Sequence, residues 1–182
     1  AYSKRNKKNF FVADQDIQNI SYKYELRPLE FQQFTNKIST VFPDNIKYLW
    51  RYYYHALGRF QMFTANPANA EKNMLVALAF SRANTADSIE SSILNNLGIL
   101  YQNDGNHTKA VSFLQDAIRE TEKTDDELLR VNILLNISYS YRMINQFRKA
   151  KLFTQEAIDI CERMKAMKFL PRALSAHSSI LI

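Results

Sequence analysis

Asn96 and Asn136 are the side chains of this sequence best suited to pair with a polypeptide backbone. Each directly precedes a Leu-Gly or Ile-Ser pair, and the two lie forty residues apart. A carboxamide has one acceptor and two N–H donors, so it can bond both the C=O and the N–H of an extended strand. We therefore expect the pair to form a ladder along a bound peptide. The alternative is that they are solvated or satisfy a neighbouring helix end, and Asn95 replaces Asn96 if the helical register shifts by one residue.

Other side chains in the same helical phase could contact the same ligand. Arginine can hold a carboxylate through two parallel N–H groups, and tyrosine offers a flat apolar ring with a polar tip. Singly, each arginine is more often a solvated surface residue, and each tyrosine could equally pack between helices. The further predicted ligand-binding residues are Tyr52, His55, Arg59, Gln102, Asn132, Tyr139, Arg142 and Arg172.

The sequence offers little support for catalysis or metal binding. His55, His107 and His177 are far apart and none is paired with Cys161 at the spacing of metal ligands, and the chain has no Gly-rich phosphate loop. Cys161 lies beside Ile158 and Ile160, where a buried thiol is expected rather than a nucleophile. We predict no catalytic residue, no metal site and no cofactor, and therefore a protein that is not an enzyme.

A forty-residue repeat of small and apolar residues must position these side chains. Leu57-Gly58 recurs as Leu97-Gly98 and, weakened, as Ile137-Ser138; two alanine series keep the same step, Ala70, Ala110, Ala150 and Ala77, Ala117, Ala157. Small residues let two helices approach closely, so the repeat predicts stacked helical hairpins. The first helix of each hairpin would turn its Leu and Gly toward the second and leave its asparagine on the inner, concave wall. The predicted fold is all-α, a right-handed superhelix of antiparallel hairpins.

The hairpins can be placed along the chain from their turn residues. Residues 1–43 are expected to form a basic arm and a helical pair, and residues 44–182 one continuous domain together with them. Asn66-Pro67 and Gly105 mark turns inside hairpins, and Thr124-Asp125-Asp126-Glu127 marks the start of a helix. The predicted repeats span 44–84, 87–122 and 125–164, with a partial repeat at 169–182; their helices span 44–64, 67–84, 87–103, 107–122, 125–143 and 147–164, and a last one begins near Pro171.

Composition and charge limit the function further. The chain has 182 residues, 46% of them hydrophobic, only three Gly, and a net charge of +6, of which Lys4, Arg5, Lys7 and Lys8 supply four. This basic arm could lie near nucleic acid, although a solvated tether is the more frequent role of so short a run. One cysteine allows no internal disulfide, and no secretory signal or long apolar run appears, so we expect a cytoplasmic protein without a membrane span.

The segment LNNLGILYQNDGNHTKAVSFLQDAI at 94–118 resembles a tetratricopeptide repeat. It keeps the Leu-Gly pair, the following tyrosine, the turn glycine and the two alanines seven residues apart. The forty-residue period is longer than the usual repeat of about 34 residues. A repeat of this length resembles instead those in the peptide-binding domains of the PlcR, Rgg and Rap group of quorum-sensing proteins. The PlcR type is the most similar, at EFQQF (30–34), YLWRYYYHALGRF (48–60) and NISYSYRMINQFRKAKLFTQEAIDI (136–160), and the resemblance covers residues 25–182.

This resemblance implies a sensor domain of a bacterial transcriptional regulator. Such domains bind a short signalling peptide in the concave groove and control an attached helix-turn-helix domain, so DNA contact would be made only by a domain absent from this chain. A homodimer is the expected assembly. The alternative is a repeat scaffold for protein interaction or dimerisation, with an apolar end at Ile180, Leu181 and Ile182 for a partner to cover.

Two other tetratricopeptide classes fit less well. Adaptors that read a chaperone's C-terminal carboxylate use Lys and Asn at set positions, and at the matching places only Asn96 agrees here. A response-regulator phosphatase of the Rap kind would require catalytic side chains in an N-terminal bundle, and we identify none.

Overall fold

The computed structural model describes residues 50–64, 66–82 and 89–180, and these residues contain helices and no strand. The predicted basic arm and helical pair at 1–43, and the first part of the first repeat, lie outside them. The chain divides into two compact units, residues 1–85 and 86–182. The single continuous domain that the repeat suggests stays a prediction.

The first unit contains one described hairpin, formed by α3 (Trp50–Phe63) and α4 (Pro67–Arg82). As the turn chemistry predicts, Pro67 is the first residue of α4. A Cβ on Gly58 would lie 2.7 Å from Met74 Cγ and 3.1 Å from the carbonyl oxygen of Ala70. Only glycine therefore allows α3 and α4 to cross at this distance, as the repeat predicts.

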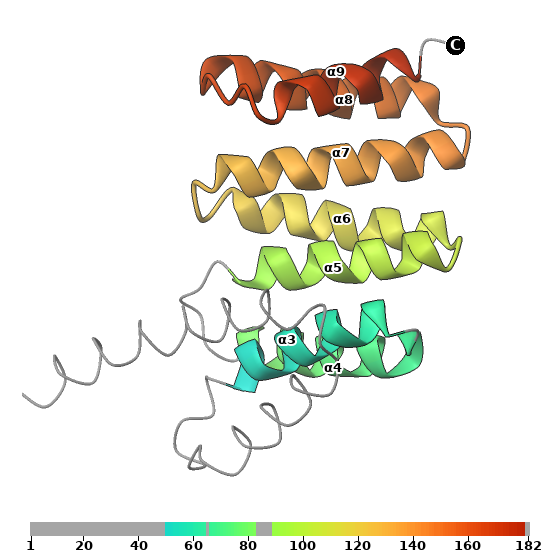
Figure 1. The fold of residues 1–182 in the computed structure, drawn as a ribbon, viewed down its shortest axis with the longest axis vertical. Coiled ribbons are helices and arrows are strands. Elements are labelled where there is room, and N and C mark those ends of the chain that lie inside the picture. Colours follow the sequence, from blue (N-terminus) through green and yellow to red (C-terminus); the bar gives the residue numbers. More distant parts are fainter. Residues whose placement is uncertain (1–49, 65, 83–88, 181–182) are drawn as a thin grey trace, which may run out of the picture. The chain divides into compact units, whose positions relative to one another are not determined.

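The second unit stacks five helices (Figure 1): α5 (Ile89–Asn103), α6 (His107–Thr121), α7 (Glu127–Met143), α8 (Phe147–Arg163) and α9 (Leu170–Ser178). Each helix packs against the next along the chain, and α7 also contacts α5 and α9. The first helices of successive hairpins, α5, α7 and α9, therefore form one wall of the stack. This arrangement is the predicted all-α solenoid of antiparallel hairpins.

The two complete hairpins of this unit cross in different ways. At the α5–α6 crossing, a Cβ on Gly98 would lie 2.5 Å from Leu114 Cγ. Forty residues later, Ser138 and Thr154 occupy these positions and are 2% and 0% exposed. Their hydroxyls bond backbone carbonyls of their own helices, Ser138 Oγ to Leu135 O at 2.8 Å and Thr154 Oγ1 to Lys151 O at 3.0 Å. Because Thr154 is smaller than Leu114, it leaves space for the side chain of Ser138, which is larger than Gly98. The replacement of Gly by Ser in the third repeat is therefore compatible with a close α7–α8 crossing.

The turns repeat as regularly as the crossings. Gly105 and Asn145, forty residues apart, have φ values of 76° and 60° within the hairpins, and Asp125 and Lys165 have values of 52° and 53° between them. Such left-handed residues commonly end helices, and glycine adopts this conformation without steric cost. The predicted role of Gly105 as a left-handed turn residue is confirmed.

Aromatic pairs fill the space beside the two later crossings. Tyr101 stacks on Phe113 and Tyr141 on Phe153, in each case with 5.4 Å between ring centroids. Tyr101 and Tyr141 are 6% and 4% exposed. Their predicted role as core residues is confirmed, because their rings are buried between the two helices of a hairpin.

Candidate peptide-binding face

The wall formed by α5, α7 and α9 carries most of the predicted ligand-binding side chains. Gln102 lies on α5, Asn132, Asn136, Tyr139 and Arg142 on α7, and Arg172 on α9. Because side chains three and four residues apart share one face of a helix, the four α7 residues lie along a single stripe. We call this wall the inner face, defined by Asn95, Gln102, Asn132, Asn136, Tyr139, Arg142 and Arg172.

Asn136 lies at the centre of a hydrogen-bonded chain that joins three helices. Its Nδ2 donates to Asn95 Oδ1 at 2.9 Å, and its Oδ1 accepts from Arg172 Nη2 at 3.4 Å. One N–H donor and one acceptor site of the carboxamide therefore remain, the pair needed to bond a peptide C=O and N–H. The α5 partner of Asn136 is Asn95, the alternative that the sequence left open. Asn96 itself is half-buried.

Arg172 and Asn132, forty residues apart, form a second link between α9 and α7. Arg172 Nη1 donates to Asn132 Oδ1 at 3.0 Å, and Asn132 Nδ2 donates to Leu128 O at 3.1 Å. The Arg172 side chain is thus held by two neutral carboxamides while the residue stays exposed to solvent.

Gln102 has a structural role as well as a place on the inner face. Its Nε2 donates to the backbone oxygen of Asn136 at 2.6 Å and to Ser140 Oγ at 2.7 Å. Both donors of this carboxamide are therefore used to join α5 to α7. Only its oxygen is left to contact a ligand.

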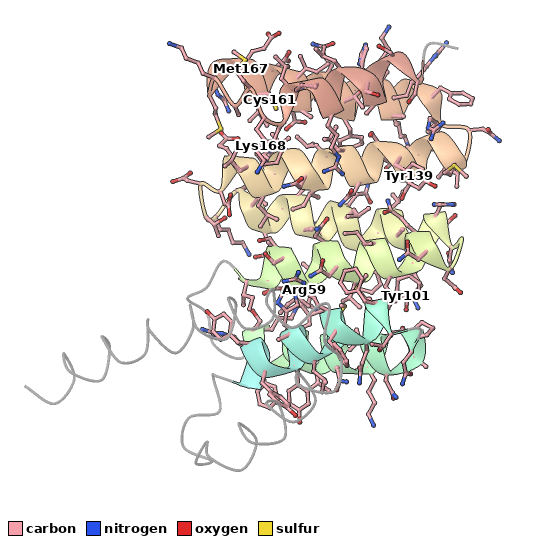
Figure 2. The ribbon with its side chains drawn as sticks, in the orientation of Figure 1. Arg59, Tyr101, Tyr139, Cys161, Met167 and Lys168 are labelled. Atoms are coloured by element: carbon pink, nitrogen blue, oxygen red, sulfur yellow. The ribbon has the colours of Figure 1, made fainter. Side chains whose placement is uncertain are left out.

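Tyr139 presents an open aromatic surface near the end of α7 (Figure 2). The residue is 42% exposed, so it is not packed between helices. The His107 and Tyr139 rings form a T-shaped pair with 5.7 Å between centroids, and the Arg142 guanidinium carbon lies 5.5 Å from the Tyr139 ring centre. These two contacts orient the tyrosine and leave part of its surface accessible.

A pocket of about 360 Å³ opens between α7 and α9 at this face. It is lined by Leu135, Asn136, Ser138, Tyr139, Arg142, Arg172, Ser175, Ala176, Ser179 and Ile180. The sequence did not single out Ser175 and Ser179. Ser175 lies three residues after Arg172 on α9 and Ser179 is the C-cap residue seven residues after it, and this helical spacing was the signal that could have found them.

Tyr52, His55 and Arg59 lie on α3 in the other unit. Tyr52 accepts a hydrogen bond from Arg51 Nη2 at 3.5 Å, and the Arg51 guanidinium lies 4.9 Å from its ring centre. Burial, with a further contribution from the charge of Arg59, lowers the pKa of His55 to about 3. His55 is therefore neutral at physiological pH. That these three residues contact the same ligand as the inner face stays a prediction.

Cys161 and the possible metal ligands can be located among the described residues. Cys161 is fully buried, and burial, followed by the nearby charge of Glu162, raises the pKa of its thiol, which keeps it protonated. The expected buried thiol is confirmed. Among the described residues no three His, Cys, Asp or Glu side chains are grouped as metal ligands, and none of the helices there has the length and apolar character to cross a membrane.

Comparisons with known proteins agree with this geometry. A family model described as tetratricopeptide repeat matches residues 89–163, which span α5 to α8. No curated protein sequence matches the chain significantly.

Three solved structures have a similar fold. A Signal Transduction ATPase with Numerous Domains (STAND) protein with a tetratricopeptide repeat sensor from Pyrococcus horikoshii has a TM-score of 0.75 and 18% identity, over 93% of this chain and 27% of its own. BtubC from P. vanneervenii has a TM-score of 0.69 and 13% identity, over 97% and 82%. Bacillus thuringiensis PlcR, in complex with the peptide PapR7 and DNA, has a TM-score of 0.69 and 14% identity, over 93% and 62%.

This chain therefore spans about a quarter of the length of the STAND protein and less than two thirds of that of PlcR. At such low identities the structures establish the fold and not the ligand. Together with the family match, they show a tetratricopeptide-like fold built from helical hairpins.

Proposed function

We propose that this chain is the ligand-sensing domain of a bacterial transcriptional regulator and that it binds a short, extended peptide on the inner face. The observation that carries the proposal is the chain of hydrogen bonds from Asn95 through Asn136 to Arg172, which fixes one polar side chain on each of α5, α7 and α9. Polar side chains repeated from one hairpin to the next can bond backbone groups at intervals along an extended peptide. The similar PlcR structure was solved with a peptide and DNA, which supports the same role here.

Binding would control an attached helix-turn-helix domain, in the cytoplasm and within a homodimer. A peptide that contacts α5, α7 and α9 together would favour one spacing of these helices over another. Only such a difference in affinity between two forms can transmit the signal.

Titration of the chain with short hydrophobic peptides encoded beside its gene tests the proposal. Isothermal calorimetry should show saturable binding in the micromolar range, and Asn136→Ala should weaken it about tenfold, because two hydrogen bonds to the peptide backbone are lost. Gln155→Ala, an exposed carboxamide on α8, is the matched control and should bind as the parent does. Equal binding by Asn136→Ala would contradict the proposed face.

A scaffold for protein association is the second candidate function, and one observation favours it. Leu174 on α9 is 47% exposed, whereas Leu94 and Leu134, at the same position of α5 and α7, are 1% and 0% exposed. A helix from a partner could cover this surface as α6 and α8 cover theirs. Sedimentation equilibrium of the chain and of Leu174→Glu tests this candidate, since only an association through this surface is weakened by the charge.

A further inference from the structure

The pocket between α7 and α9 has an unbalanced positive charge. Its lining includes Arg142 and Arg172 and contains no Asp or Glu. The hydroxyl groups of Tyr139 and Ser175 add further donors around the same space, whereas Ser179 Oγ already donates to Ala176 O at 2.7 Å. The pocket therefore offers cationic and neutral donors without a competing anion.

Neutral groups hold Arg172 in place and leave its charge uncompensated. A guanidinium has five N–H donors, and the bonds to Asn132 and Asn136 use two of them. A carboxamide oxygen orients the guanidinium but carries no negative charge. Three donors and the full positive charge therefore remain available to a ligand.

Arg142 is oriented in a similar way by an uncharged partner. Its guanidinium carbon lies 5.5 Å from the centre of the Tyr139 ring, and the side chain is half-buried. A cation held by a ring still has its planar edge free to donate hydrogen bonds. Within residues 89–180, neither Arg142 nor Arg172 forms an ion pair.

The arginines of a second pocket in the same unit show the opposite arrangement. That pocket, of about 390 Å³, is lined by six carboxylates with Arg130 and Arg163. Arg130 pairs with Glu156 at 2.7 Å and Arg163 with Glu127 at 2.5 Å. Pairing with acids is thus available to arginine in this fold, and within the described part of this unit neither arginine of the α7–α9 pocket is paired in this way.

We propose that the α7–α9 pocket binds a carboxylate of the peptide ligand through Arg142 and Arg172. A carboxylate can accept parallel N–H bonds from guanidinium groups, and such charge-assisted bonds are stronger than those between neutral groups. The inference rests on the proposed peptide-binding function and adds the chemistry of one ligand group. The carboxylate could be the C-terminus of the peptide or an acidic side chain.

The first test probes the pocket with a small carboxylate. N-acetyl-Leu-Ala with a free carboxylate, and the same compound as its amide, are titrated while the arginine Nε–Hε signals are followed by NMR. We expect the acid alone to shift the two signals that disappear in the Arg142→Gln and Arg172→Gln variants. The absence of any shift with the acid would overturn the carboxylate site, whether or not a longer peptide binds.

The second test measures the affinity of a bound peptide in four forms, with its C-terminus free or amidated and its acidic residue kept or replaced by glutamine. The form that lacks the recognised carboxylate should bind about tenfold more weakly, and the Arg142→Gln/Arg172→Gln double variant should lose this discrimination. Arg148→Gln, an exposed arginine on α8, is the matched control and should keep it.

The outcomes separate the two proposals. Equal affinity of all four peptides would overturn the carboxylate site while peptide binding stands. Acid-specific NMR shifts without binding of any longer peptide would support the carboxylate site and contradict the peptide-sensing function. Circular dichroism of each variant confirms that the fold is kept, as expected for substitutions at the protein surface.

Discussion

The hairpin α3/α4 and the hairpins α5/α6 and α7/α8 share one forty-residue register but fill it differently. At the crossing they use Gly58 with Met74, Gly98 with Leu114, and Ser138 with Thr154. A smaller residue on one helix is matched by a larger one on the other, or two medium residues meet. The comparison shows that the combined volume at the crossing is maintained although the individual residues change.

The space beside the crossing differs more strongly. Tyr101 and Tyr141 stack on phenylalanines, whereas at the same register Gln61 accepts a hydrogen bond from Asn73 Nδ2 at 2.7 Å. A polar pair thus replaces an aromatic stack without loss of the hairpin. Since the family model matches only residues 89–163, the polar pair lies in the hairpin outside that match.

A third register position changes from one hairpin to the next. His55, Asn95 and Leu135 lie forty residues apart on successive first helices. Asn95 is 9% exposed and bonds Asn136, and Leu135 is 4% exposed within an apolar cluster around Cys161. The same place in the fold can therefore hold a histidine, a carboxamide or an alkyl chain.

The largest expected effect is the pH dependence conferred by His55. Because its pKa falls from an ordinary 6.5 to about 3 on folding, the unfolded chain binds more protons between these values. The free energy of unfolding should therefore decrease as the pH falls below 6.5, by up to about 1.4 kcal/mol per pH unit from this group. His55→Gln should remove this dependence, and urea unfolding followed by the fluorescence of Trp50, the only tryptophan, measures it. Parallel pH profiles for the two proteins would show that His55 is not the cause.

A methyl group at the second crossing should be the next most damaging change. Gly98→Ala gains about 1 kcal/mol of helix propensity but places its Cβ 2.5 Å from Leu114 Cγ. We expect a net loss of about 2 kcal/mol in the free energy of unfolding, measured by denaturant titration. Ser138→Ala, at the same position of the third hairpin, is the control and should cost less than about 1 kcal/mol, because a Cβ is already accommodated there.

An exchange of crossing types tests whether the volumes are coupled. Thr154→Leu alone should destabilise the third hairpin, because the larger side chain meets Ser138. Ser138→Gly should partly restore stability in the double variant, with a coupling free energy of about 1 to 2 kcal/mol in a double-mutant cycle. Additive effects of the two substitutions on the free energy of unfolding would mean that the volumes at positions 138 and 154 are not coupled.

The smallest expected effect comes from placing an aromatic stack in the first hairpin. Gln61→Tyr alone leaves the Asn73 amide without its present acceptor and should be destabilising. Adding Asn73→Phe should recover about 0.5 to 1.5 kcal/mol by stacking. Thermal unfolding of the two single variants and the double variant measures this coupling. If the double variant is no more stable than the less stable single variant, the positions of Gln61 and Asn73 are not equivalent to those of the aromatic stacks.

The sequence by itself determined the helices, their pairing and their turns. The small residues at forty-residue steps set where the two backbones of a hairpin can approach, and Pro67 and Gly105 fix the local backbone geometry of the turns. Helix crossings and turns can therefore be predicted from residues that are close in the sequence. Only the tertiary structure decided that Asn136 bonds Asn95, that Thr154 compensates Ser138, and that Arg172 is held by carboxamides instead of carboxylates. These contacts join different helices, and the rotation from one helix to the next, which sequence spacing does not specify, determines which side chains meet.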